Sequence, residues 1–394
     1  MKVLLVNKFY YNRGGDCTAV FGTEYLLKSK GHEVAVFSVN DPQNVPTPWS
    51  KYFPKKVDFS ISGISGKASS VMRLFHSREV SVKFNRILSD FKPDVVHLHN
   101  IHSYISPLVA EIAHKRGIRV VWTLHDYKLI CPTYICLRNG NVCEECFKDN
   151  SKVFKHKCMK NSSIASMLAW MEARYWNRDR LNRATDLFIS PSSFLKANMV
   201  SAGYPADKIE VLHNFLPEGV PASKEKEDYF CYVGRLSEEK GVDVLLEAAA
   251  QLPYKLKVIG GGPLLEVFRE KYSSEHIEFY GQMKPEVLYP IVQKARLLVL
   301  PSVWYENNPF SIIEALCMGT PVLGSKIGGI PELIEENVNG GLFAAGDIED
   351  LRDKISSCFL HFTDGYDFEK IACDAQNKFG SESFYNKLIY IYDR

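Results

Sequence analysis

Short apolar runs alternate with longer stretches of mixed polarity along the whole chain. The runs are rich in Val, Leu and Ile, and helical stretches separate them. Strands that alternate with helices in this way are typical of parallel sheets covered by helices on both faces. The predicted strands are Lys2–Asn7, Glu33–Phe37, Asp94–His99, Val120–Leu124, Leu187–Ile189, Ile209–Leu212, Tyr229–Val233, Leu256–Ile259, Ile277–Tyr280, Ala295–Leu300 and Pro321–Gly324.

The strands predict an α/β protein with two doubly wound, Rossmann-like domains. A chain of 394 residues is long enough for two domains. The first is expected at 1–217 and the second at 229–380, joined by a linker at 218–228 that is rich in Pro and charge. An amphipathic helix is expected at 381–394. In doubly wound sheets the ligands bind at the carboxyl ends of the strands.

Composition favours a soluble globular protein, and the charge is unevenly distributed. No apolar run reaches transmembrane length, and the N-terminal run is too short for a signal peptide, so we expect a cytoplasmic location. Residues 1–217 hold 30 Lys+Arg and 18 Asp+Glu, a net +12, and the remainder holds 48−30 = 18 and 46−18 = 28, a net −10. The basic half suggests an anionic partner, such as a membrane surface or a lipid-linked diphosphate, or else it is simply a solvated surface.

Two glutamates, Glu306 and Glu314, follow the predicted strand Ala295–Leu300. The strand ends at Pro301, a polar loop follows, and an apolar helical run begins at Phe310. The N-terminus of that helix offers free backbone N–H groups and the positive end of its dipole, both of which attract anions. We therefore expect a phosphate group at Phe310 and Ser311.

A second cationic site is predicted after the strand Tyr229–Val233. Gly234 permits a tight turn, and Arg235 and Lys240 then place two cations beside the strand end. Arg can hold a phosphate with two parallel bonds, and Lys adds a point charge. Together with the helix at Phe310 these residues predict a nucleoside diphosphate site, with Glu314 accepting from ribose hydroxyls.

These motifs resemble the retaining glycosyltransferases of family 4, the glycogen-synthase-like group with the GT-B fold, in which two Rossmann-like domains face a cleft. The resemblance covers nearly all of the C-terminal half. It is carried by Gly234-Arg235-Leu236, Lys240-Gly241, the stretch from Glu306 to Ala315, Gly319-Thr320-Pro321-Val322, Gly328-Gly329-Ile330-Pro331-Glu332 and Asn339-Gly340-Gly341-Leu342.

The resemblance implies transfer of a sugar from a nucleotide-diphosphate sugar to an acceptor hydroxyl, with the anomeric configuration kept and no cofactor required for catalysis. It makes Glu306, Arg235, Lys240 and His125 the expected catalytic residues, His125 because it matches the histidine that points at the donor sugar. The expected donor-binding residues are Gly14, Gly15, Asn307, Asn308, Phe310, Ser311 and Glu314. It also implies that the segment 381–394 crosses back onto the first domain.

The acceptor side is expected in the first domain. His97 and His99 share one face of a predicted strand, because side chains alternate along a strand. We assign His99 and Asn100 to the acceptor side. Asp126 is a candidate to orient the ring of His125. Each of these histidines, and the pair Gly14 and Gly15, is also explained by a purely structural role.

Five cysteines fall between positions 131 and 158. The pair Cys143 and Cys146 has the two-residue gap that suits one tetrahedral metal ion. A structural zinc site at Cys136, Cys143, Cys146 and Cys158 is one interpretation, with Cys131 or His156 as alternative ligands. Free thiols and redox chemistry are the others.

Three other functions remain open: a sugar-nucleotide epimerase, a retaining phosphorylase, and a non-catalytic subunit that kept only the fold. The last should have lost Arg235, Lys240 or Glu314, and all three are present. A UDP-sugar is favoured over a GDP-sugar as donor. The expected acceptor is a glycan or lipid-linked molecule in surface polysaccharide or glycolipid assembly, with peripheral membrane contact and no nucleic acid.

Overall fold

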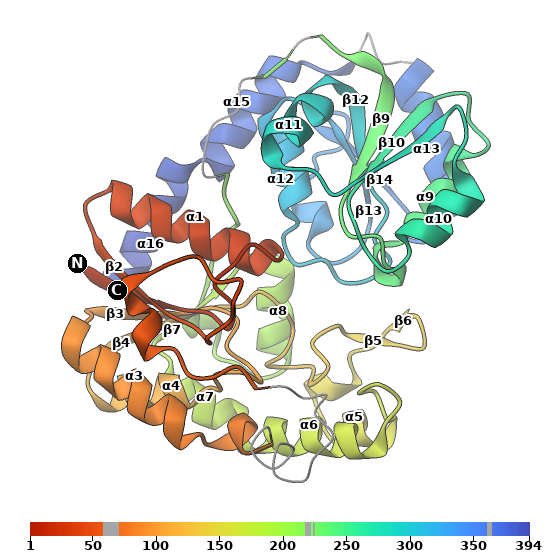
Figure 1. Ribbon diagram of the computed structural model, residues 1–394. Helices are drawn as coiled ribbons and strands as arrows, with labels where there is room; N and C mark the ends of the chain where they lie inside the picture. The colour runs from red at the N-terminus through yellow and green to blue at the C-terminus, as the bar shows by residue number, and fades with distance from the viewer. Residues whose placement is uncertain (58–70, 217–221, 224, 361–364) are drawn as a thin grey trace. The chain divides into compact units, whose positions relative to one another are not determined.

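The computed structural model describes residues 1–57, 71–216, 222–223, 225–360 and 365–394 (Figure 1). They form two compact units: unit 1 comprises residues 1–213 and 385–394, and unit 2 comprises residues 214–384. Each unit contains its own six-stranded sheet in which every pair of strands is parallel. The predicted α/β class with two doubly wound sheets is confirmed.

The sheet of unit 1 has the order β2-β1-β3-β4-β7-β8. Helices cover both of its faces, α1 and α16 on one side and α3 and α4 on the other (Figure 1). The strands are therefore shielded from solvent, and in β1 the side chains of Val3, Leu4, Leu5 and Val6 are completely buried. The bounds are β1 Lys2–Val6, α1 Gly15–Ser29, β2 Glu33–Phe37, α3 Arg78–Phe91, β3 Val95–Leu98, α4 Leu108–Lys115, β4 Arg119–Thr123, α7 Arg178–Ala184, β7 Leu187–Ser190, α8 Ser193–Ser201, β8 Ile209–Val211 and α16 Ser381–Asp393.

A segment between β4 and α7 lies outside this sheet and was not assigned elements from the sequence. It contains the two-residue strands β5 (Leu137–Arg138) and β6 (Asn141–Val142), which pair antiparallel, and the short helix α5 (Lys152–Lys155). The longer helix α6 (Ser163–Tyr175) follows. The Ser162 hydroxyl caps it by accepting from the Ala165 N–H, which satisfies one of the free donors of the first turn.

The sheet of unit 2 has the order β11-β10-β9-β12-β13-β14. Its bounds are β9 Glu227–Val233, α9 Val242–Ala249, β10 Lys255–Ile259, α10 Leu265–Tyr272, β11 Ile277–Gly281, α11 Pro285–Lys294, β12 Ala295–Leu300, α12 Phe310–Cys317, β13 Val322–Ser325, β14 Gly340–Phe343, α13 Ile348–Leu360 and α15 Phe368–Phe379. The edge strand β14 was not predicted, because paired glycines are poor strand formers. A Cβ at Gly340 would stand 1.9 Å from the Val322 carbonyl oxygen, so glycine is needed for this pairing.

The linker differs in detail from the expected one. Strand β9 begins at Glu227, inside the expected linker 218–228, and residues 217–221 and 224 lie outside the described chain. At the other end, residues 385–394, which include most of α16, belong to unit 1. The Tyr392 hydroxyl lies 2.7 Å from His97 Nδ1, and Arg119 donates to the Ile391 carbonyl over 3.0 Å.

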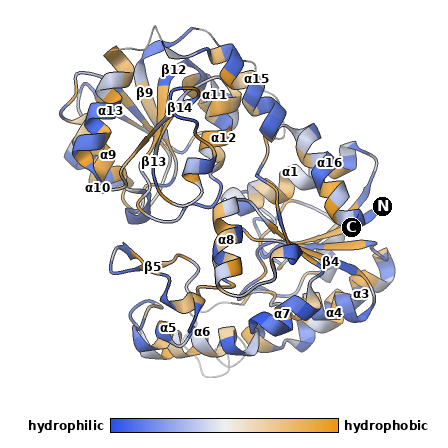
Figure 2. Ribbon diagram, turned by 180° about the vertical axis from the view of Figure 1, so that it is seen from behind, coloured by the Kyte–Doolittle hydropathy of each residue, from blue (hydrophilic) through white to orange (hydrophobic). Residues whose placement is uncertain are grey.

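Hydropathy follows the two sheets, whose strands are mostly orange in Figure 2. Within the described chain, no helix combines the length and the apolar character needed to span a bilayer.

Candidate functional site

The carboxyl edge of β12 holds a buried carboxylate in unit 2. The loop after β12 carries Ser302 and Glu306, both buried. Glu306 Oε1 accepts from Lys240 Nζ and from the Ser302 hydroxyl, each over 2.6 Å. Ser302 is held in turn, because the Ser325 hydroxyl on β13 donates to its carbonyl over 2.6 Å. The structure therefore brings together two of the expected catalytic residues, Lys240 and Glu306.

The pair fixes the protonation state of Glu306. Burial by itself would raise the pKa of its carboxyl, but the charge of Lys240 and the hydrogen bonds from Lys240 and Ser302 outweigh burial and hold the pKa below its usual value. At neutral pH the group is an ionised carboxylate in a site that excludes water. Such a group can accept hydrogen bonds from sugar hydroxyls.

Glycines bring neighbouring loops against this pair. A Cβ at Gly328, where φ is +61°, would stand 2.5 Å from the Glu306 carbonyl oxygen, and the Gly329 N–H donates to that oxygen over 2.7 Å. A Cβ at Gly241, where φ is +60°, would stand 2.1 Å from the Pro301 carbonyl oxygen. Only glycine fits such close contacts at positive φ. The Gly328-Gly329 and Lys240-Gly241 motifs therefore shape the loop that carries Glu306.

A second glycine run, missed in the sequence analysis, supports the turn that carries Arg235. A Cβ at Gly260 would stand 1.8 Å from the Gly234 carbonyl oxygen, and one at Gly262 would stand 2.3 Å from the Leu236 carbonyl oxygen. The Leu236 N–H donates to the Gly261 carbonyl over 2.9 Å. Arg235 itself is exposed at this edge. Three glycines directly after a predicted strand were the signal that could have revealed this contact.

Helix α12 begins at the same edge of the sheet. It starts at Phe310, and Pro309 before it has no N–H, so Phe310 and Ser311 are the first residues of the helix that can offer backbone donors. Glu314, one turn along, is half-buried and accepts from the Tyr289 hydroxyl over 3.3 Å. Burial raises the pKa of the Glu314 carboxyl to about 7. This helix start thus combines anion-binding donors with a carboxyl that ionises near neutral pH.

The two asparagines of this loop differ in surroundings. Asn307 is half-buried, whereas Asn308 is buried. The Asn308 side-chain oxygen accepts from the Asn214 N–H, and its carbonyl accepts from the Asn214 side chain, both over 2.7 Å. Asn308 therefore ties the start of unit 2 to the loop, and the donor-binding role expected for it stays a prediction.

In unit 1 the histidines at the carboxyl edge form a contiguous set. His99 Nδ1 lies 2.9 Å from His125 Nε2, and the rings of His97 and His99 are 4.2 Å apart between centroids. Burial lowers the pKa of all three, that of His97 to about 3, although Asp16 and Asp126 act in the opposite direction on His125. At neutral pH the three rings are therefore uncharged.

His99 contacts the ring of His125. Its own side chain is buried, whereas His125 is half-buried. His99 thus helps to fix the ring of His125, and the acceptor-side role expected for His99 stays a prediction. Asp126, expected to orient His125, accepts instead from the Lys128 N–H over 2.9 Å.

Asn100 and the glycine loop meet at the start of α1. The Asn100 side chain donates to Asp16 over 3.1 Å. Burial would raise the pKa of Asp16, but His125, Lys8 and Asn100 together hold it below its usual value. Gly14 and Gly15 are exposed. At Gly14 the backbone is extended, with φ 177°, and a Cβ would meet only Asp16 Oδ1 at 3.8 Å, so the fold itself does not require glycine there.

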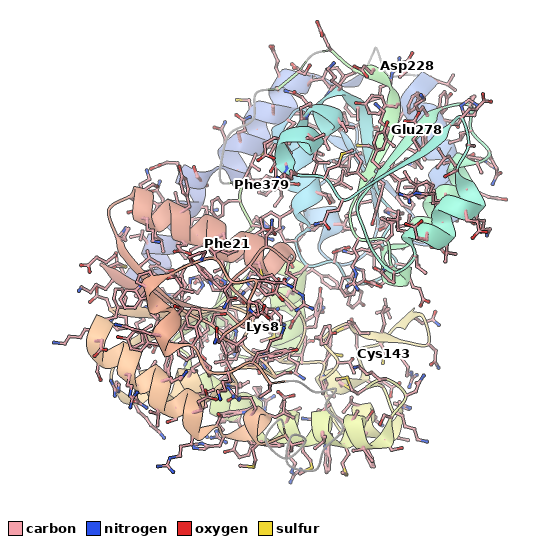
Figure 3. All side chains as sticks on the ribbon, viewed as in Figure 1. Lys8, Phe21, Cys143, Asp228, Glu278 and Phe379 are labelled. Atoms are coloured by element: carbon pink, nitrogen blue, oxygen red, sulfur yellow. The ribbon has the colours of Figure 1, made fainter. Side chains whose placement is uncertain are left out.

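The five cysteines of the segment 131–158 gather in unit 1, where Cys143 lies beside the β5–β6 hairpin (Figure 3). Cys131 hydrogen-bonds Cys136, and Cys146 is within electrostatic range of Cys131, Cys143 and Cys158. From 137 to 161, Val153 is the one buried apolar side chain. As the side chains stand, no three His, Cys, Asp or Glu residues of the described chain form a group fit for a metal ion. The zinc site therefore stays a prediction that requires the thiols to draw closer.

Two glycosyltransferase family models together match most of the chain. Residues 24–218 match the profile described as Glycosyltransferase Family 4, and residues 218–360 match the one described as Glycosyl transferases group 1. An uncharacterized 42.6 kDa protein in the cps region of Klebsiella pneumoniae is 27% identical over 374 residues, which is 89% of this chain and 91% of that protein.

Solved structures agree on the fold. A lipopolysaccharide outer core galactosyltransferase, WaaB in its apo form, has a TM-score of 0.65 at 20% identity and covers 99% of each chain. The Anabaena protein HepE in complex with UDP-glucose has a TM-score of 0.65 at 16% identity, over 100% of this chain and 99% of that one. The GT-B fold expected from the motifs is confirmed.

Proposed function

The chain belongs to the glycosyltransferases of the family 4 group, and on this premise we propose that it transfers a sugar from a UDP-sugar to a hydroxyl of a growing glycan or glycolipid, with retention of the anomeric configuration. The observation that carries the proposal is the carboxyl edge of unit 2. There an exposed guanidinium, a partly buried Lys240–Glu306 pair and the start of α12 lie on the loops that follow the neighbouring strands β9 and β12.

Such a site must first stabilise the leaving diphosphate. As the bond between the sugar and the diphosphate breaks, negative charge builds up on the leaving oxygens and must be stabilised. We assign this to Arg235, Lys240 and the backbone N–H groups of Phe310 and Ser311. Lys240 carries three donors, so it can keep Glu306 with one and offer the others to a phosphate.

We assign the hydroxyls of the sugar and of the ribose to two carboxyl groups that differ in pKa. Glu306 stays ionised, and we assign it to the sugar hydroxyls. Glu314, with its pKa near neutrality, accepts from ribose hydroxyls once ionised. His125 keeps contact with the donor sugar, as the family resemblance implies, and its neutral ring supplies one donor and one acceptor. We keep Gly14 and Gly15, at the start of α1, as donor-contact residues. The fold does not require glycine at Gly14, which supports a functional reason for it.

The choice of substrates rests on the relatives. HepE was solved with UDP-glucose, WaaB is named a galactosyltransferase of the lipopolysaccharide outer core, and the Klebsiella relative lies in a cps region. These names support a UDP-sugar as donor and a surface glycan or glycolipid as acceptor. The basic first half, with its net charge of +12, supports an anionic, lipid-linked acceptor at the inner face of a membrane.

A binding screen followed by a transfer assay tests this function. A ligand that binds only the folded state raises the melting temperature, so UDP-sugars should raise it more than GDP-sugars. Arg235→Ala should abolish the shift. Arg269→Ala is the matched control, since Arg269 lies on α10 of the same unit and its guanidinium pairs with Glu266 on the same helix. The anomeric configuration of the product, read by proton NMR, should equal that of the donor.

Three results would overturn the proposal. A melting shift that persists undiminished in Arg235→Ala would place the diphosphate elsewhere. Conversion of a UDP-sugar without any acceptor into an isomeric UDP-sugar would make the protein an epimerase, and consumption of inorganic phosphate as acceptor would make it a phosphorylase.

A further inference from the structure

Helix α6 of unit 1 has its apolar side outward. Ile164, Met167, Met171 and Tyr175 are all exposed, Ile164 to 70% and Met171 to 43%. Their spacings of three, four and four residues place them on one stripe, because an α-helix repeats every 3.6 residues. We call these four residues the outer stripe.

The inward side of the same helix is small and polar. Ser166, Ala169 and Glu172 are its buried residues. The Ser166 hydroxyl accepts from the Met159 N–H over 2.9 Å, and Glu172 forms a buried ion pair with Lys128 at 2.9 Å. A helix on a water-soluble protein normally turns its apolar stripe to the core. Here polar contacts fix the opposite orientation. The bonds of Ser166 and Glu172 hold the helix so that, within the described chain, the outer stripe faces outward and stays exposed.

Other large apolar side chains extend the uncovered surface. Phe154 on α5, 42% exposed, stacks near Trp170 of α6 with ring centroids 6.4 Å apart. Phe75 meets Tyr175 edge-on at 5.4 Å, and Met72 beside it is 56% exposed. Contiguous exposed apolar surface of this kind marks interaction sites.

Lysines border this surface at its α5 side. From Asn150 to Met171 the chain carries Lys152, Lys155, Lys157 and Lys160 and no acidic residue, and Asp149 just before them interacts with Lys152 and Lys155. Lys155, Lys157 and Lys160 are exposed, and α5, which carries Lys155, packs against α6. An apolar stripe bordered by lysines is the chemistry of a helix that lies in the headgroup region of an anionic bilayer.

We propose that the outer stripe of α6, with Phe154 and the lysines 155, 157 and 160, docks unit 1 on an anionic membrane surface. A second copy of the chain suits this surface less well. A two-fold dimer would join the same patch of both copies and bring two sets of exposed lysines together. Anionic headgroups neutralise those lysines while the acyl boundary covers the stripe.

Vesicle co-sedimentation of the full chain tests the proposal without any need for substrate or activity. The wild type should bind vesicles of phosphatidylcholine with about one third phosphatidylglycerol, and should bind pure phosphatidylcholine vesicles only weakly. The variant Ile164→Gln/Met167→Gln/Met171→Gln keeps helix-forming side chains, and its binding should fall roughly tenfold or more. The variant Lys155→Gln/Lys157→Gln/Lys160→Gln should bind on the order of a hundredfold more weakly at low salt.

Val267→Gln/Val287→Gln is the matched control. These valines are also highly exposed, at 57% and 56%, but lie on α10 and α11 of unit 2, so the control should bind like the wild type. An unchanged far-ultraviolet circular dichroism spectrum and melting temperature verify that each variant folds.

The proposal is overturned if the wild type ignores anionic vesicles, or if the helix variant binds them as well as the wild type does. It is also overturned if sedimentation velocity finds a wild-type dimer that the helix variant abolishes, because a second copy would then cover the stripe.

Discussion

Replacing Glu314 by Gln should stabilise unit 2 at alkaline pH while it weakens donor binding. The carboxyl has its pKa raised from 4.5 to about 7 by burial. Between these values the unfolded chain has released the proton and the folded chain still holds it. The unfolded state therefore binds fewer protons, and the free energy of unfolding falls as the pH rises from about 4.5 to about 7. A neutral amide removes this penalty.

The size of the effect follows from the shift. The rise in the pKa from 4.5 to about 7 corresponds to roughly 3 kcal/mol at pH 8. Because Glu314 is only half-buried, about 1 to 2 kcal/mol is the expected gain. For a unit the size of residues 214–384 this is a rise in melting temperature of roughly 3 to 6 °C.

The assay is thermal unfolding of the wild type and Glu314→Gln at pH 5 and at pH 8. The variant should melt close to the wild type at pH 5 and clearly above it at pH 8, and Glu336→Gln, which alters an exposed residue of the same unit, should match the wild type at both. Calorimetry should show weaker UDP binding by Glu314→Gln, and wild-type affinity should rise with pH through about 7 as the carboxylate forms. If wild type and variant melt in parallel at both pH values, Glu314 is not desolvated and the reasoning fails.

Two further predictions concern the Lys240–Glu306 pair and the cysteine cluster. Lys240→Met leaves the Glu306 carboxylate buried without its cation, so the free energy of unfolding measured in urea should fall by about 3 to 5 kcal/mol. Glu306→Gln in the same chain should restore most of this loss. Equal stability of the single and double variants would contradict the ion pair. Elemental analysis of protein purified without chelator should find about one zinc per chain. Cys143→Ser should lose this zinc. Cys373→Ser should keep it, because Cys373 is exposed and lies far from the cluster in the sequence, and a metal-free wild type would exclude the zinc site.

The sequence can group the expected donor-side residues because they follow one another along short loops. Gly234 to Lys240 and Glu306 to Glu314 each lie directly after a buried strand, and the carboxyl ends of parallel strands share one edge. The neighbour order of strands is what a single sequence does not contain. The contact between Lys240 and Glu306, and the support of Gly234 by Gly260, depend on β9 lying between β10 and β12.

Two features of unit 1 were not predictable from the sequence, for physical reasons of the same kind. His99 follows β3 and His125 follows β4, and only the pairing of these strands reveals that one ring lies behind the other. The polarity of α6 is a stronger case. Periodicity would turn Ile164 and Met171 to the core, but the ion pair of Glu172 and the hydrogen bond of Ser166 orient the helix the other way. Tertiary polar contacts outweigh the apolar pattern there.

A crystal structure with UDP bound tests the central claim most directly. The account predicts the diphosphate at the start of α12, within hydrogen-bond distance of Arg235 and the backbone N–H groups of Phe310 and Ser311, with ribose hydroxyls on Glu314. A nucleotide bound at any other edge of either sheet, or a diphosphate that reaches none of these donors, would contradict it.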